Sequence, residues 1–298
     1  MQLAEIYSGA GIMGIDNTAA KMILMMKNIQ GVDLNEALIF GHQKNYLGQK
    51  LRKRIASEYQ VPRKTLKDEY ADVFLRSVGA ENFQILDISN YEGASIIQDL
   101  NLPLSPALTG KFSAVIDIGT SEHIFNATQS IANLRSLCKV GGNVLILSPA
   151  NNYLGHGFYQ FSPELFFRAF DAEYGFEIQS VYLIKQRLFW ESWYKLTDPR
   201  NLKRRGTIQT NRRCYLGAIA KKVASETQLS PPQQSDYVTA WVDKKTSRFG
   251  ALYLSAPRII QTCLDLTIMA LLARWRGRLK RQRFYWKNGL YLPRSKVS

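Results

Sequence analysis

One apolar run of the sequence ends in a group of residues that can do chemistry. Residues 112–126 read FSAVIDIGTSEHIFN, in which Asp117 and Gly119 are soon followed by Glu122 and His123. A histidine titrates near neutral pH, and a neighbouring carboxylate can orient it or act as a base itself. The spacing makes Glu122 and His123 candidates for removing a proton from a hydroxyl. The structural alternative is a histidine that caps the junction between a strand and a helix.

The other two histidines of the chain also follow apolar runs. His42 comes after ALIF and Gly41, and His156 lies in NNYLGHGFYQF. This second stretch is rich in glycine, aromatic and polar residues, which suits a loop that closes over a bound molecule. His156 is therefore a third catalytic candidate, with an ordinary aromatic loop as its alternative.

Two aspartates end further apolar runs. Asp87 closes FQILD, and Asp99 follows SIIQ. A carboxylate at the end of a buried strand is costly unless solvent or a hydrogen-bonding group satisfies it. Ligands of an open parallel sheet bind outside the carboxyl ends of its strands. These residues therefore predict one polar ligand site at that edge of a sheet.

The elements that would position these residues alternate between strands and helices, which predicts an α/β fold. Strands are expected at 37–40, 83–88, 112–118, 143–147, 178–184 and 214–220, with a long helix-prone stretch at 48–79. Asn126 is the expected N-cap of a helix, with Gln129 as its capping-box partner and Gly141 and Gly142 at its end. Ser162, Pro163 and Glu164 are expected to open another helix.

This order of elements and strand-end residues resembles the class I S-adenosylmethionine-dependent methyltransferases. The likeness covers residues 38–223 and is strongest from 83 to 170, where LCKVGGNVLILSPANNYLGHGFYQFSPELF follows the FSAVIDIGTSEHIFN stretch. The resemblance implies a Rossmann-like, mostly parallel sheet with an antiparallel last strand and helices on both faces. It also implies S-adenosylmethionine as the cofactor and methyl transfer to a hydroxyl or amine of a small molecule, sugar or glycan intermediate.

The residues that the resemblance assigns to the cofactor all follow strands. They are Asp87 with Ile88 for the ribose hydroxyls, Asp99 and Leu100 for the adenine, and Asp117, Gly119 and Thr120 for the methionine and sulfonium side. A carboxylate can accept from two ribose hydroxyls at once, and hydrogen bonds to charged groups contribute about 1.5–3 kcal/mol. A glycine lets the backbone approach a ligand closely.

The first motif departs from the family, which usually carries several glycines after its first strand. Here the segment reads LIFGHQKNYLG, with Gly41 alone and Gly48 seven residues later. Some 40 residues then separate Gly41 from the second strand. We favour an altered cofactor loop in which Gly41, His42 and Gln43 take part. The alternative is a non-catalytic methyltransferase-like binding or scaffold protein that has lost the cofactor.

Two other kinds of site have weaker support. GAGIMG at residues 9–14 matches the GxGxxG dinucleotide fingerprint, which would indicate an NAD(P)-dependent oxidoreductase. Its context is poor, because only MQLAEIYS precedes it and Asp33 comes before the next strand rather than at its end. No metal site is predicted, since the three histidines follow separate strands without ligand spacing.

The composition is that of a globular protein, with 46% hydrophobic and 21% charged residues. The cysteines Cys138, Cys214 and Cys263 lie far apart with no CxxC pair, which argues against a disulfide framework and suits a reducing compartment. The N-terminal residues lack the features of a signal peptide, and no apolar segment is long enough to span a membrane. A cytoplasmic location is expected.

Basic charge is concentrated near the C-terminal end. Residues 243–298 hold 13 Lys and Arg but two Asp and Glu, a net +11 of the chain's +15. Apolar residues recur there at helical spacing, namely Ile260, Leu264, Ile268, Leu271, Trp275 and Leu279. This pattern predicts a basic amphipathic helix.

The predicted organisation has four parts. They are an N-terminal helical segment (1–36), a methyltransferase-like domain (37–223), a linker (224–254) and the basic helical tail (255–298). The tail could pack on the domain or on a second subunit of a homo-oligomer, or lie on the anionic inner surface of a membrane. Nucleic acid is the least favoured partner, because the rest of the chain is almost balanced in charge.

Overall fold

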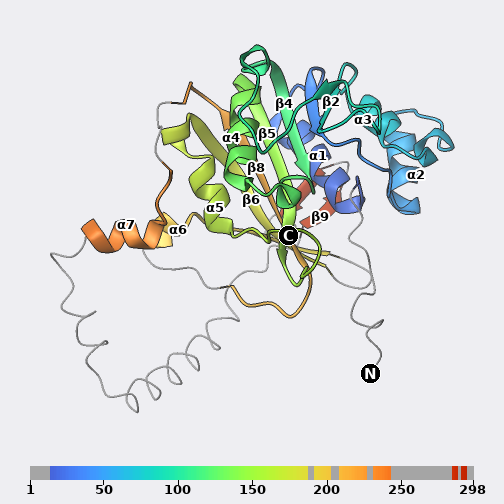
Figure 1. Ribbon diagram of the computed structural model, residues 1–298. Coiled ribbons are helices and arrows are strands. Elements are labelled where there is room, and N and C mark those ends of the chain that lie inside the picture. Colours follow the sequence, from blue (N-terminus) through green and yellow to red (C-terminus); the bar gives the residue numbers. More distant parts are fainter. Residues whose placement is uncertain are drawn as a thin grey trace, which may run out of the picture.

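The computed structural model describes residues 14–186, 191–202, 208–226, 231–242, 284–287 and 290–293 (Figure 1). Within these residues one eight-stranded sheet has the order β3-β2-β1-β4-β5-β8-β6-β7. Its strands are β1 (Ala37–Phe40), β2 (Gln84–Asp87), β3 (Ile96–Ile97), β4 (Phe112–Ile118), β5 (Cys138–Asn151), β6 (Phe176–Gln186), β7 (Glu191–Lys195) and β8 (Cys214–Lys222).

The sheet is mostly parallel. Strands β1 to β5 pair in parallel, whereas β8 runs antiparallel to its neighbours β5 and β6, and β7 runs antiparallel to β6. The chain moves outward from β1 to β2 and β3 and then returns to place β4 on the other side of β1. This reversal is the topological switch point at which ligands of such sheets bind. The predicted fold class, a Rossmann-like sheet with an antiparallel last strand, is confirmed.

Helices cover both faces of the sheet (Figure 1). Residues of α1 (Asn17–Gln30), α2 (Gln49–Glu58) and α3 (Asp72–Ser77) belong to one buried core, and residues of α4 (Ala127–Leu137) and α5 (Pro163–Ala169) belong to the other. The described residues also form α6 (Pro199–Leu202) and α7 (Ser235–Val242). Alternate side chains of each strand point to opposite faces. Accordingly, Ile39 belongs to the same buried core as Met22 of α1, whereas Leu38 belongs to the core that contains Leu134 of α4.

Local sequence signals set several helix starts. Asp16 precedes α1 and accepts from the backbone N–H groups of Thr18 and Ala19. Asn126 accepts from the Gln129 N–H at the start of α4, and Ser162 accepts from the Glu164 N–H at the start of α5. The Gln129 side chain, however, donates to Asn133 instead of closing the capping box.

The predicted end of the helix after Asn126 is wrong. Helix α4 ends at Leu137, and β5 begins at Cys138 and runs through both glycines. The buried Lys222 ammonium group donates to the carbonyls of Arg135 and Cys138, which satisfies the end of the helix four residues early. Gly142 serves close packing, because a Cβ there would lie 2.8 Å from the Ser113 carbonyl oxygen.

The segment after the sheet also differs from the prediction. Residues 235–242 of the expected linker form α7, and the Glu164 carboxylate accepts from the Ser235 N–H at its start. The six apolar residues of the expected tail helix, 260 to 279, lie outside the described residues. Two described segments of the tail are strands, β9 (Phe284–Lys287) and β10 (Leu290–Pro293), which pair antiparallel.

This hairpin has a local cause. The two segments are rich in aromatic residues, which favour strands. The dipeptide between them in the sequence is Asn-Gly, which favours two-residue hairpin turns more than most pairs. The expected helix therefore does not include residues 284–287 or 290–293. Among the described residues, no helix has the length and apolar character needed to cross a bilayer.

A buried arginine ties α5 to the segments that follow it. Arg168 is 4% exposed and donates to both carboxylate oxygens of Asp198 at 2.7 Å and to Asp171 at 3.2 Å. We expect Arg168→Ala to lower the free energy of unfolding by about 3 kcal/mol, because it leaves the partly buried Asp198 carboxylate without its cation and leaves Asp171 paired with Arg200 alone.

Urea denaturation measures this loss. Lys139→Ala is the matched control, since Lys139 and Glu36 form an exposed ion pair at 3.2 Å that contributes about 0–1 kcal/mol. Equal, small losses in the two variants would contradict the structural role given to Arg168.

Candidate active site

Three strand ends meet at the switch point between β1 and β4. Gly41 follows β1 in the left-handed region, with φ of 70°, which favours glycine. A Cβ placed on Gly41 would lie 3.8 Å from Asp87 Oδ2 at the end of β2 and 3.7 Å from Thr120 Oγ1 beyond β4. The structure thus brings Gly41, Asp87 and Thr120 together around one open piece of backbone.

The atypical loop after β1 is fixed by its neighbours. The Gln43 amide donates to the Phe40 carbonyl at 2.7 Å and lies 3.6 Å from the Cβ position of Gly41. Its other atom, Oε1, is buried without a hydrogen-bond partner among the described residues. Farther along, Ile15 donates to Lys44 O, and Ala71 donates to Gln43 O. The loop is therefore held between the segment before α1 and the segment before α3.

His42 lies apart from these residues in its contacts. Its Nε2 is 2.9 Å from Asp72 Oδ1 and its Nδ1 is 2.6 Å from the Glu92 carbonyl oxygen. The ring also stacks on Tyr70, with centroids 3.6 Å apart. Both ring nitrogens are thus already in contact with oxygen atoms of the chain.

The residues expected near the adenine lie beyond β2 and β3. Asp87 Oδ1 accepts from the Ile88 N–H at 2.6 Å, and Ile88 itself is 65% exposed. Asp99 Oδ1 accepts from the backbone and side-chain nitrogens of Asn101 at 2.8 and 2.9 Å. Leu100 is buried, and its carbonyl accepts from Asn133 of α4. In both Asp87 and Asp99, the hydrogen bonds within these turns use Oδ1, and Oδ2 takes no part in them.

Asp117 is completely buried at the end of β4. Its Oδ1 accepts from the backbone N–H groups of Thr120 and Ser121, at 3.0 and 3.4 Å. Its Oδ2 has no hydrogen-bond partner among the described residues. Burial, and next the nearby Glu122 carboxylate, raise the pKa of Asp117 to about 7.

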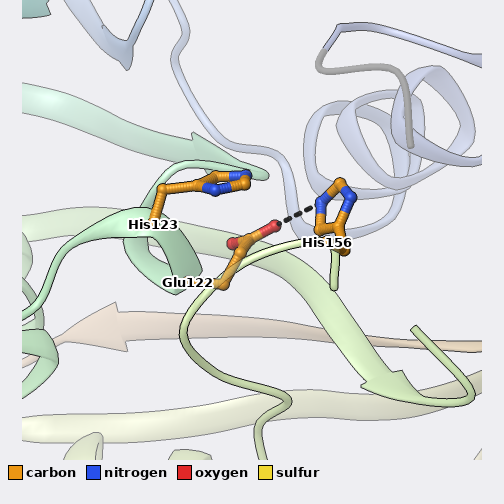
Figure 2. A group of neighbouring side chains, drawn as sticks. All are labelled: Glu122, His123 and His156. Carbon is orange, nitrogen blue, oxygen red and sulfur yellow. Dashed lines mark ion pairs between the residues drawn. The ribbon is translucent and has the colours of Figure 1, made fainter. Parts of the chain in front are cut away.

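Glu122, His123 and His156 form a cluster beside this aspartate. Glu122 and His123 belong to the short 3-10 turn η4 (Ser121–His123), and His156 comes from the loop after β5. Glu122 Oε1 lies 3.4 Å from His156 Nε2, and the Ser148 hydroxyl donates to Glu122 Oε2 at 3.0 Å. Figure 2 shows the Glu122 carboxylate pointing toward the ring of His156.

The two histidine rings lie close to each other as well. Their centroids are 4.9 Å apart, and both rings are partly buried. Burial lowers the pKa of His123, and the His156 ring acts in the same direction, whereas the Glu122 carboxylate opposes them. His123 Nε2 is buried without a partner among the described residues.

The loop after β5 packs directly on η4. The N–H groups of Phe158 and Tyr159 donate to the Glu122 carbonyl at 2.9 and 3.2 Å. Gly157 permits this approach, because a Cβ there would lie 2.9 Å from that carbonyl oxygen and 3.2 Å from His123 Nδ1. This stretch was expected to close over a bound molecule; its packing on η4 was not predicted and is a product of the fold.

A small pocket of about 30 Å³, partly open to solvent, lies beside the cluster. Glu122, His156 and Gly119 contribute to its lining, and so do Asp16 and Tyr215, which the sequence analysis did not single out. Asp16 is the N-cap of α1, and burial raises its pKa. The N-cap pattern DNTAAK could have located this residue at a helix start, but not at the pocket.

The GAGIMG stretch falls almost entirely outside the described residues. Its last residue, Gly14, lines the same pocket and is followed by the capping Asp16. Ile15 forms an isolated parallel bridge to Asn45. Gly14 therefore does not follow any described strand of the sheet, as a dinucleotide fingerprint requires.

These residues fit the cofactor that the resemblance implies. The strand ends supply an open glycine, a carboxylate at β2 and a buried, unpaired carboxylate oxygen at β4. Gln43 Oε1 is a further unpaired acceptor next to Gly41. A ligand with ribose hydroxyls and a positive charge would satisfy such acceptors, since buried polar groups are costly when unpaired.

Comparisons with known proteins found no family and only distant structural matches. No protein-family description and no curated protein matches the chain. Among solved structures, a proposed methyltransferase from Bacillus halodurans matches at 10% identity and a TM-score of 0.37, over 66% of this chain and 94% of that one.

Two further matches have similar values. Geranyl diphosphate methyltransferase, solved with S-adenosylmethionine, matches at 11% identity and a TM-score of 0.36, over 69% of this chain and 85% of that one. A branched-chain polyamine synthase from Thermus thermophilus matches at 11% and 0.37, over 72% of this chain and 59% of that one. Such values carry no conclusion about activity, and the fold rests on the strand order and directions above.

The raised pKa of Asp117 predicts a pH dependence of stability. The folded state holds this proton up to about pH 7, whereas the unfolded state loses it near pH 4. The unfolded state therefore binds fewer protons in between, and stability falls as pH rises through this window. We expect Asp117→Asn to remove that decline while keeping an oxygen for Thr120 and Ser121. The free energy of unfolding of Asp117→Asn, relative to that of wild type, should rise by a few kcal/mol from pH 5 to pH 8.

Urea denaturation at both pH values measures the difference. Asp33→Asn is the control, because Asp33 is an exposed aspartate that also accepts one backbone N–H, at 2.9 Å. A stability difference between wild type and Asp117→Asn that does not change with pH would contradict the assignment.

Proposed function

We propose that this protein transfers a methyl group from S-adenosylmethionine to a hydroxyl or amine of a small molecule or glycan intermediate. One observation carries the proposal. Gly41, Asp87 and Thr120 meet at the switch point of the sheet, next to a buried carboxylate–histidine cluster. These residues would place the cofactor beside a proton acceptor, as methyl transfer to a protonated acceptor requires.

Residues at the strand ends would hold the cofactor. Asp87 would accept from the ribose hydroxyls, while Ile88, Asp99 and Leu100 would lie along the adenine. Gly41 and Gln43 would approach it from β1. Asp117, Gly119 and Thr120 would line the methionine and sulfonium side, where the positive charge of the cofactor would favour the charged form of Asp117, whose Oδ2 has no partner among the described residues. When bound, the cofactor supplies an electrophilic methyl group on a positively charged sulfur.

The cluster would act on the acceptor. A new bond from the acceptor oxygen or nitrogen to the methyl carbon forms as the sulfur–carbon bond breaks, and its electron pair stays on sulfur. His156 Nδ1 makes no hydrogen bond to the described residues, and it would take the proton that the acceptor loses. Glu122 would orient the ring through Nε2, as carboxylates do in other histidine bases. His123, whose ring centroid lies 4.9 Å from that of His156, would pack against this pair.

The surroundings of the pocket support a small acceptor. Phe125, Leu154 and Phe158 are all more than half exposed, and Phe125 and Phe158 meet edge to face at 5.6 Å. An apolar part of the acceptor could pack on these side chains, because exposed aromatic groups gain from such burial. The acceptor itself is a matter for screening.

The cofactor assignment predicts a binding defect. We expect Asp87→Asn to weaken S-adenosylmethionine and S-adenosylhomocysteine by about 10–100-fold in calorimetric titration, because hydrogen bonds to a charged acceptor are lost. Asparagine keeps an oxygen for the Ile88 N–H, so the turn should stay folded.

Asp33→Asn is again the matched control, since Asp33 precedes β1 and lies at the other end of that strand. Unchanged affinity in Asp87→Asn would remove the ribose assignment. No binding by wild type would favour the scaffold function, and binding of NADH instead would favour the oxidoreductase.

The acceptor assignment predicts a rate defect. Methyl-labelled S-adenosylmethionine, offered with a panel of hydroxyl- and amine-bearing small molecules and glycans, measures transfer. With an acceptor in hand, we expect His156→Gln to lower the rate by about 100-fold or more. Its affinity for S-adenosylmethionine should stay within about twofold of wild type. A variant that loses cofactor affinity but not turnover would assign His156 to the cofactor instead.

A further inference from the structure

The Glu122–His123–His156 cluster has the composition of a metal site. Each of the three residues offers one ligand atom, and these atoms all lie within 4.8 Å of one another. Two histidines and one carboxylate are a common ligand set for zinc in enzymes, with a fourth position left for water or substrate. The histidines follow different strands, so only the fold brings them together (Figure 2).

Two of these side chains lack the partners that burial demands. Glu122 is completely buried, and its Oε1 makes no hydrogen bond to the described residues. His123 Nε2 is likewise buried and without a partner there. Buried polar atoms are nearly always paired, and an unpaired carboxylate oxygen is costly. A cation between them would satisfy both atoms at once.

The distances suit a small tetrahedral ion. Ligands about 2.0–2.1 Å from a zinc ion at tetrahedral angles lie roughly 3.3–3.4 Å from each other. Glu122 Oε1 and His156 Nε2 are 3.4 Å apart, and they do not form a well-aligned hydrogen bond. The ligand atom of His123 lies within 4.8 Å of the other two, so a small movement of its side chain would bring it to the same spacing.

Supporting contacts are also present. Ser148 donates to the second oxygen of Glu122 at 3.0 Å, which leaves Oε1 free and fixes the carboxylate. The backbone of Glu122 is held by the N–H groups of Phe158 and Tyr159. Metal ligands are typically oriented by hydrogen bonds of this kind.

We propose that Glu122, His123 and His156 bind one divalent transition-metal ion, with Zn²⁺ the best match to their geometry. The pocket lined by Glu122, His156, Gly119 and Asp16 leaves room for a fourth ligand. Binding of the ion does not depend on the activity proposed above. Its role does rest on that activity: the ion would bind the oxygen of a hydroxyl acceptor and ease the loss of its proton.

Metal titration of the full chain tests the proposal. The protein is stripped with a chelator, and Zn²⁺ is titrated by calorimetry. Co²⁺ is titrated by visible absorption, which reports tetrahedral coordination. We expect one ion per chain with micromolar or tighter affinity. Substitution of residues that only support the ligands of a metal site lowers metal affinity by about 10–100-fold. Substitution of a ligand itself should therefore lower the affinity by more than this.

The variants are Glu122→Gln, His123→Gln and His156→Gln, with His42→Gln as the matched control. His42 is the remaining histidine of the chain, and its ring nitrogens contact Asp72 and the Glu92 carbonyl. Circular dichroism of each stripped variant shows whether it folds. The proposal requires weak binding in the three cluster variants and wild-type binding in His42→Gln.

Absence of stoichiometric binding by wild type, or equal binding in His156→Gln, would overturn the metal site. S-adenosylmethionine affinity is measured on the same samples. If wild type binds the cofactor but no metal, only the metal-site proposal is wrong. If it binds metal but no cofactor, only the proposed methyl transfer is wrong.

Discussion

The site depends on one constraint, the burial of β4 on both faces of the sheet. Every residue of Phe112–Ile118 is buried between β1 and β5. Such a strand needs apolar side chains throughout, and its polar residues concentrate where it ends. The turn after β4 must therefore satisfy Asp117 and Glu122 within very few residues. It does so partly with backbone N–H groups and Ser148, and it leaves one oxygen of each carboxylate unpaired.

Those unpaired oxygens give the pocket its chemical character. Asp16, Asp117 and Glu122 gather near one opening, and burial raises the pKa of the first two. A cation entering this region would favour the charged form of each carboxylate and offset part of the cost of burying it. Both inferred ligands meet that need in different places. A sulfonium would lie toward Asp117, and a metal ion would lie between Glu122 and the histidines.

The sequence predicted those features that short segments decide. Strands β1 and β4 have the predicted bounds because each is an uninterrupted apolar run, and Asn126 and Ser162 cap helices through their own side chains. The end of α4 was missed because Lys222, some 85 residues away, satisfies its last carbonyls. The site followed the same rule. Glu122 and His123 were visible as neighbours, whereas their contact with His156 and the approach of Asp16 are products of the fold.

The altered loop after β1 is explained by the same long-range contacts. In the family that the sequence resembles, glycines after the first strand bring backbone close to the cofactor. Here only Gly41 has that freedom, and the next residues bond to the segments before α1 and α3. The loop thus also positions the start of α1, which places Asp16 at the pocket. A loop that braces one wall of the pocket cannot also wrap a ligand with several glycines, so more of the cofactor contacts fall to the ends of β2 and β4.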